Sequence, residues 1–309
     1  GVWNLMGEQF VKEGFNLVYY EQDGDYNRTV VTLLGDPHKI IDAVVEFTGV
    51  VEKEIDMNTQ SGEHPRMGAV DVIPFIPITG VTMDECVTYA NEIAKKINEA
   101  YNIPIFMYAE AANQKIRVKL PNIRKGEFEG MKEKIQEAKW APDYGRAEIH
   151  PTFGVIGVGA RIPLIAYNID LDTDDVDIAN KIAKAIRFTS GGFRHVQAGP
   201  VFLETRGHTQ VTMNILDYKK NPMYRILETV KMEAKRYGIE VPSCELVGLM
   251  PKGVIINSLK YYYAVEGKPW VKGLALEDLT QEAIKYMGFR DFDVLKIIEV
   301  VYDAMFFPL

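Results

Sequence analysis

The sequence predicts an α/β protein of two related subdomains, each layering β-strands with α-helices. Short runs rich in Val, Ile and Phe alternate with longer segments of helical periodicity along the 309 residues. A strand–helix–strand order occurs in the first half, and this order normally forms a right-handed crossover in a sheet. The second half repeats strands, a hairpin and helices. We therefore place the subdomain boundary between residues 1–160 and 161–309.

The first half opens with two β-rich runs separated by an acidic turn. Asp36-Pro37 then predicts a helix, since it supplies an N-cap and a proline in the first turn. Thr82 followed by Glu85 forms a capping box that starts a second helix. The predicted strands are 16–20, 28–34, 70–77 and 103–108, and the predicted helices are 37–51, 82–101 and 128–138.

Residues 145–159 are predicted to form a long loop. Five of these residues are Gly or Pro. Glycine adds chain entropy and proline removes a hydrogen-bond donor, so both weaken the interior of a helix or strand. A long glycine-rich loop in a compact protein is typical of a binding element or a domain join.

The second half is predicted to combine a β-hairpin with helices. The hairpin turns at Arg206-Gly207, and the helix after it stops at Gly238. The predicted strands are 164–170, 196–203, 210–216 and 245–249, and the predicted helices are 173–187, 222–237, 251–263 and from 279 to the C-terminus.

Composition excludes several classes of protein. The net charge of −8 argues against a nucleic-acid binder, and no apolar run approaches the roughly 18–20 residues that cross a bilayer. Cys86 and Cys244 are far apart, and no histidine pair has metal-ligand spacing, so we expect no metal site. The first fifteen residues do not resemble a signal peptide, and we expect a cytoplasmic protein.

His64 is the first candidate for catalysis, because its segment precedes a predicted buried strand and an imidazole exchanges protons near neutral pH. An ordinary loop histidine explains the same residues equally well. The acidic turn with Glu21, Asp23 and Asp25 beside Arg28 offers a site for an amidine, or simply solvates a hairpin.

The segment from Gly62 to Val72, Gly-Glu-His-Pro-Arg-Met-Gly-Ala-Val-Asp-Val, resembles the most recognisable stretch of the glutamate formiminotransferase family. It continues into Pro-Phe-Ile-Pro at 74–77. The resemblance covers most of the chain, densely to about residue 170. Further similar positions are 27–30, 108–112, 120–121, 123–124, 126–127, 140–143, 154, 159–161 and 166–168, with weaker matches at 210–211, 214, 216–217 and 245–249.

This resemblance implies two α/β subdomains whose sheets face each other across an elongated ligand cleft, with helices on the outer faces, and a homodimer. It implies that His64 is the catalytic base. It also implies a folate-binding loop, made of Gly145, Arg146, Ala147, Glu148, Ile149, His150, Pro151, Thr152, Phe153 and Gly154.

The implied reaction moves a formimino group from N-formimino-L-glutamate to N5 of tetrahydrofolate, the co-substrate, in histidine degradation. Arg28 and Arg66 are candidates for binding substrate carboxylates, because guanidinium groups pair with carboxylates bidentately. Glu21, Asp23 or Asp25 is a candidate for stabilising the amidinium-like intermediate. We expect no metal in the reaction.

Two alternatives remain open from the sequence. One is transfer of a formyl group from N-formylglutamate, or handling of 5-formyltetrahydrofolate, on the same scaffold. The other is a non-catalytic folate-binding relative. Family members begin with a Val-Pro-Asn-Phe-Ser-Glu-Gly type segment that this sequence lacks, so its N-terminus is truncated, incompletely represented or divergent. If the strand is truly missing, we expect an unpaired sheet edge and an incomplete site wall. The cyclodeaminase part of some relatives is also lacking, so we expect no release of ammonia.

Overall fold

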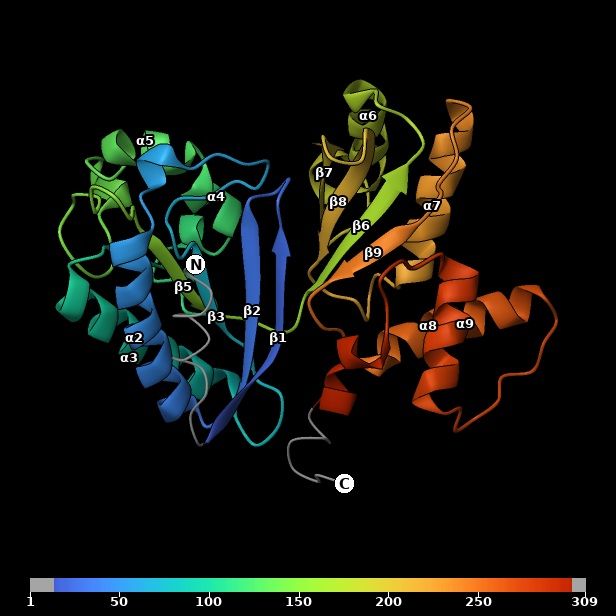
Figure 1. Cartoon of the computed structure of the whole chain (residues 1–309), viewed down its shortest axis with the longest axis horizontal. Helices are drawn as coiled ribbons and strands as arrows, with labels where there is room; N and C mark the ends of the chain where they lie inside the picture. The colour runs from blue at the N-terminus through green and yellow to red at the C-terminus, as the bar shows by residue number, and fades with distance from the viewer. Residues whose placement is uncertain (1–13, 302–309) are drawn as a thin grey trace. The chain divides into compact units, whose positions relative to one another are not determined.

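The structure is a computed structural model that describes residues 14–301 (Figure 1). The chain divides into two compact units between Ile162 and Pro163, and the short segment Tyr19–Glu21 groups with the second unit. Each unit combines helices with a β-sheet, which confirms the predicted α/β class. The expected gap at the N-terminus falls on residues outside the described range. The predicted cleft stays a prediction.

The first unit contains a hairpin and a parallel sheet. The hairpin pairs β1 (Phe15–Asp23) with β2 (Arg28–Gly35). The parallel sheet has the order β3 (Val72–Phe75), β5 (Ile156–Ala160), β4 (Ile105–Ala109), so that β5 is central. Both neighbours of β5 run parallel to it.

Two long helices pack in the first unit, as the caps in the sequence predict. The Asp36 side chain accepts a hydrogen bond from the His38 N–H at the start of α2 (Pro37–Glu54). Thr82 and Glu85 form the predicted capping box of α3 (Met83–Tyr101). Helix α3 packs against β3, β5 and α2 (Figure 1). The shorter helices are α4 (Leu120–Arg124), α5 (Glu127–Lys134), and the 3₁₀ turns η1 (Met57–Thr59), η2 (Lys115–Arg117) and η3 (Ala138–Trp140).

The prediction that residues 145–159 are all loop is wrong for its last part, because 156–160 form the central strand β5. The two glycines of this strand give it room among its neighbours. A Cβ on Gly157 would lie 2.8 Å from the Met67 methyl carbon, and one on Gly159 would lie 2.7 Å from the Tyr108 ring. Glycine inside a strand often marks such a close approach, and here it permits a fully buried strand.

The second unit is built on an antiparallel sheet with the order β7 (Val196–Leu203), β8 (His208–Ile215), β6 (Ile165–Leu171), β9 (Cys244–Val247). Its helices are α6 (Val176–Ile186), α7 (Met223–Arg236), α8 (Lys252–Val265) and α9 (Leu276–Met287). The predicted last helix ends earlier than expected, because Gly288 adopts a left-handed conformation (φ 74°) at its C-cap. A 3₁₀ turn, η5 (Val294–Lys296), follows.

Strand β6 separates an apolar face from a polar face. Tyr167, Ile169 and Leu171 are fully buried in the core of the second unit. Asn168 and Asp170 alternate with them and therefore lie on the opposite face of the sheet. The apolar core is built with residues of the helices, and the polar face carries hydrogen-bonding groups.

Candidate active site

The turn between β1 and β2 holds the segment that carries His64. The backbone N–H of Glu63 donates to the carbonyl oxygen of Asp25 at 3.2 Å, and the N–H of His64 donates to that of Tyr26 at 3.4 Å. The acidic turn and the histidine segment were separate features of the sequence. The fold places them in contact.

The predicted folate loop contacts the same segment from its C-terminal side. Val155 donates its N–H to the carbonyl oxygen of Met67 at 3.1 Å, and Ala69 donates to that of Phe153 at 2.9 Å. Gly154 has φ 89°, and a Cβ there would lie 2.3 Å from the Met67 oxygen. Only glycine fits this junction, because both the backbone conformation and the space exclude a side chain.

Arg66, a predicted ligand for substrate carboxylates, is held by carboxylates of the protein itself. Its guanidinium donates to Glu127 at 2.9 Å and contacts Glu129 at 2.5 Å. Its backbone N–H also donates to the Glu127 side chain at 3.2 Å. These contacts fix the residue that follows His64-Pro65, and the predicted binding role of Arg66 stays a prediction.

A second arginine, Arg124 at the end of α4, lies in this region without having been given a role from the sequence. It pairs with Asp71, whose other oxygen accepts the N–H of Met67 at 2.9 Å. Burial raises the pKa of Asp71 more than Arg124 and the N–H lower it. The pair thus anchors the end of the His64 segment to α4.

His64 is a neutral imidazole in this environment. Burial lowers its pKa from 6.5 to about 3, with further repulsion from the charges of Arg28 and Arg124. A neutral imidazole has one N–H group and one nitrogen that carries a lone pair. A shielded imidazole with one unprotonated nitrogen is suited to accept a proton.

The predicted folate loop is attached to the first unit by several contacts. His150 lies 3.3 Å from Glu52 of α2 through its Nε2 atom and accepts the N–H of Phe153 at 3.2 Å through Nδ1. The Phe153 side chain is fully buried in the core of the first unit. It therefore anchors the loop to the core and is not exposed to contact a ligand. Residues 145–148 are exposed. The folate-binding assignment of residues 145–154 stays a prediction.

The three acidic candidates differ in their surroundings. Glu21 accepts a hydrogen bond from the Tyr19 hydroxyl. Asp23 accepts the N–H of Tyr26 at 3.0 Å, which stabilises the turn. Asp25 is half-buried. The predicted electrostatic role of one of these residues stays a prediction.

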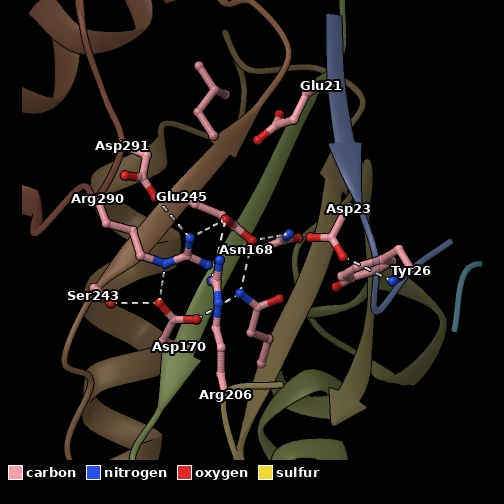
Figure 2. A network of polar contacts seen from close by, with 12 residues as sticks. Glu21, Asp23, Tyr26, Asn168, Asp170, Arg206, Ser243, Glu245, Arg290 and Asp291 are labelled. Carbon is pink, nitrogen blue, oxygen red and sulfur yellow. Dashed lines mark hydrogen bonds and ion pairs between the residues drawn. The ribbon is translucent and has the colours of Figure 1, made fainter. Parts of the chain in front are cut away.

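The second unit carries a polar network that sequence reasoning did not find (Figure 2). It is centred on Asp170 of β6, which accepts hydrogen bonds from Gln210 at 2.7 Å, Ser243 at 2.6 Å and Arg290 at 2.9 Å. His208 Nε2 also lies 3.2 Å from Asp170. Burial alone would raise the pKa of Asp170, but these hydrogen bonds outweigh it and hold the pKa below its usual range.

Glu245 of β9 is the second carboxylate of this network. It accepts hydrogen bonds from Asn168 at 3.0 Å and Gln210 at 2.9 Å, and lies 2.6 Å from Arg290. Figure 2 shows Arg290 between the two carboxylates. Arg290, and Arg206 at 4.0 Å from Glu245, offset the two negative charges, and the hydrogen bonds stiffen the polar face of this sheet. The polar residues at alternate positions of the predicted strand 164–170 were the signal in the sequence.

Among residues 14–301, no group of three His, Cys, Asp or Glu side chains is arranged to hold a metal ion. Within the same range, no helix is both long and apolar enough to cross a membrane.

The fold and the site define a class of protein: a two-unit α/β protein with a shielded, neutral histidine beside arginines. Such a site is suited to proton transfer on anionic substrates, since arginine attracts carboxylates and the imidazole accepts a proton. Comparison with known families makes the class specific. Residues 4–161 match the N-terminal subdomain of the formiminotransferase domain, and residues 166–305 match the formiminotransferase domain. The chain belongs to the formiminotransferase family.

Curated relatives agree with this assignment. A glutamate formimidoyltransferase of Streptococcus pyogenes is 47% identical over 253 residues, which cover 82% of this chain and 85% of the relative. That of Thermoplasma acidophilum is 41% identical over 249 residues, covering 80% and 82%. A formimidoyltransferase-cyclodeaminase of Dictyostelium discoideum is 38% identical over 259 residues, and this region is 48% of its length.

Proposed function

We propose that this chain is a glutamate formimidoyltransferase that moves the formimino group of N-formimino-L-glutamate to N5 of tetrahydrofolate, with His64 as the general base. The products are 5-formiminotetrahydrofolate and glutamate, and the reaction belongs to histidine degradation. The observation that carries the proposal is the neutral, half-buried imidazole of His64 beside Arg28 and Arg124, in a chain of this family.

The proposed chemistry is an addition followed by an elimination. N5 of tetrahydrofolate attacks the formimino carbon, and a new N–C bond gives a tetrahedral intermediate. His64 accepts the proton that N5 loses and returns it to the nitrogen of glutamate as the old C–N bond breaks. Proton transfer of this kind contributes roughly 10² to 10⁴-fold to a rate.

The two arginines supply a reason why the base works only with substrate bound. Their positive charges oppose protonation of His64 in the free protein. A carboxylate of formiminoglutamate that pairs with Arg28 or Arg124 offsets this repulsion, so the affinity of His64 for a proton increases. Arg124 thereby joins Arg28 and Arg66 as a candidate ligand. Arg124 already pairs with Asp71, and Arg66 with Glu127 and Glu129, so a substrate carboxylate would share these guanidinium groups with protein carboxylates.

Tetrahydrofolate is the proposed co-substrate, bound by the loop of residues 145–154. Residues 145–148 are exposed, so the pterin or aminobenzoate portion of a ligand can reach this part of the loop. The net charge, the absence of a paired-cysteine pattern and the curated relatives support a cytoplasmic enzyme. A homodimer is part of the same proposal, and sedimentation should give twice the 35.0 kDa mass of the chain.

The test is a kinetic comparison of His64→Gln with the unsubstituted protein. Formiminoglutamate and tetrahydrofolate are mixed with protein, and the product is read as the absorbing methenyl form after acid treatment. His64→Gln is expected to lower kcat by roughly 10² to 10⁴-fold, because the proton acceptor is lost. The dissociation constant of tetrahydrofolate is expected to change little.

His38→Gln is the matched control, because His38 lies on α2 with an exposed side chain and a weak contact of 3.7 Å to Glu92. It should retain the full rate. A His64→Gln protein with an unchanged kcat would remove His64 from the mechanism. Product formed from N-formylglutamate but not from formiminoglutamate would overturn the proposed donor.

A further inference from the structure

Asn27 makes an unusual set of contacts at the tip of the β1–β2 turn. It has a left-handed backbone (φ 46°), and its N–H closes the turn on the carbonyl oxygen of Gly24 at 3.3 Å. Asparagine tolerates this conformation better than most residues. The turn is therefore preformed by its own sequence, and it directs the Asn27 side chain at one neighbouring segment.

That segment is the one that leads into His64. The amide nitrogen of the Asn27 side chain donates to the carbonyl oxygen of Ser61 at 2.7 Å and to the side-chain oxygen of Gln60 at 3.2 Å. The backbone bonds from Glu63 and His64 to Asp25 and Tyr26 continue the same contact by two residues. The amide of Asn27 and the turn backbone together hold four of the five positions from 60 to 64, namely 60, 61, 63 and 64.

Gly62 lies in the middle of this contact and shows how close it is. A Cβ on Gly62 would lie 2.5 Å from Asn27 Cβ and 2.6 Å from the carbonyl oxygen of Tyr26. Its φ is not in the left-handed region, so space alone calls for glycine at this position. The close packing lets the short side chain of Asn27 reach the backbone beyond Gly62.

We propose that Asn27 is a positioning residue, which fixes the approach of the His64 segment so that the imidazole is held where it can accept the proton from N5. This role rests on the proposed function of His64. The amide N–H groups of Asn27 serve the protein and not a substrate, because both point at protein oxygens. The free energy of these exposed hydrogen bonds is small, so the main consequence of losing them is local.

Two substitutions of Asn27 distinguish the effect of its left-handed backbone conformation from the effect of its side-chain amide. Asn27→Asp keeps the size of the side chain but places a carboxylate oxygen against the oxygens of Ser61 and Gln60. Asn27→Gly keeps the left-handed backbone and removes the side chain. Both are expected to lower kcat on the order of ten-fold, because a small misplacement of a catalytic group is enough for such a loss. The KM for tetrahydrofolate should stay within about two-fold, since the folate loop is not touched.

Amide hydrogen exchange gives a readout that does not depend on catalysis. The N–H groups of Glu63 and His64 bond to the turn, so their exchange should become faster on the order of ten-fold in both variants, with exchange elsewhere unchanged. Asn102 is the matched control, since it is an exposed asparagine with a left-handed backbone (φ 56°) that caps α3. Asn102→Asp and Asn102→Gly should leave kcat and the exchange of residues 63 and 64 unchanged.

Gly62→Ala is the second variant, because it forces the segment away from the turn while Asn27 is intact. It should also lower kcat and speed exchange at 63 and 64. Unchanged kcat and exchange in the Asn27 variants would overturn the proposal, as would full activity of a folded Gly62→Ala protein. A lower kcat without faster exchange would also overturn it, since Asn27 would then act on the substrate. Absence of formimino transfer by the unsubstituted protein would contradict the proposed function instead, and the exchange data would still decide about Asn27.

Discussion

His64 illustrates how the fold changes the chemistry of a single residue. An unperturbed histidine titrates near pH ~6.5, whereas burial and the nearby charges of Arg28 and Arg124 lower the pKa of His64 to about 3. The residue type alone predicted a group that exchanges protons at neutral pH. Its surroundings instead make it a base that stays neutral until the local charge changes.

This pKa predicts a dependence of stability on pH. Between about pH 6.5 and about pH 3 the unfolded chain binds a proton at His64 that the folded chain does not bind. The free energy of unfolding should therefore fall as the pH is lowered through this range, by up to about 1.4 kcal/mol per pH unit from this residue. Urea unfolding at several pH values measures the slope.

His64→Gln serves as the control for this measurement, because glutamine does not titrate. The difference in stability between the two proteins should change with pH below about 6.5 and be constant above it. A difference that does not change with pH would mean that His64 keeps its usual pKa in the folded protein.

Strand β5 shows the same dependence on surroundings at the scale of an element. Its sequence, Ile-Gly-Val-Gly-Ala, favours a loop by composition, yet it is the buried centre of a parallel sheet. The glycines weaken the intrinsic preference for a strand and at the same time make room for Met67 and Tyr108. The close approach of these two side chains comes from distant parts of the chain, so the strand could not be predicted from its own composition.

Gly159→Ala tests this explanation. The added methyl would lie 2.7 Å from both the ring and the carbonyl oxygen of Tyr108. The strand must shift to relieve the contact, so we expect a loss of about 1–3 kcal/mol in the free energy of unfolding. Gly199 in β7 is the matched control, since no atom lies within 4 Å of an added Cβ. Gly199→Ala should change stability by less than about 0.5 kcal/mol. Equal effects in urea unfolding would contradict the packing explanation.

At the scale of the whole molecule, each unit encloses a core of its own. The core of the second unit is built from residues between Ile165 and Ile297, and the main core of the first unit from residues between Phe15 and Ala160. A unit with its own core satisfies the usual condition for folding by itself. The two matched parts of the family, 4–161 and 166–305, follow the same division.

The fragment 163–309 is accordingly expected to fold alone. It should show a cooperative thermal transition and a dispersed NMR spectrum, and it should lack formimino transfer because His64 is in the other unit. Ile169→Ala, which removes a fully buried side chain, should lower the transition temperature of both the fragment and the full chain. A fragment that melts without cooperativity would show that the second core depends on the first unit.

The sequence by itself determined most of the elements, though not β5 or α4, together with the caps of the two long helices of the first unit and the segment around His64. These features depend on residues within a few positions of each other, through hydrogen bonds such as that from His38 to Asp36 and the capping box at Thr82. The match to a family also needs only the order of residues, and it identified His64 as the candidate base.

The tertiary structure alone decided which charges surround these residues. It placed Arg124 near His64, paired Arg66 with Glu127 and Glu129, and buried the side chain of Phe153 in the core beneath the predicted folate loop. Electrostatic effects and close packing depend on distances in space between residues that are far apart in the chain. Patterns of neighbouring residues in the sequence do not specify these distances. The neutral state of His64 and the contacts of Asn27 could therefore be identified only in the folded protein.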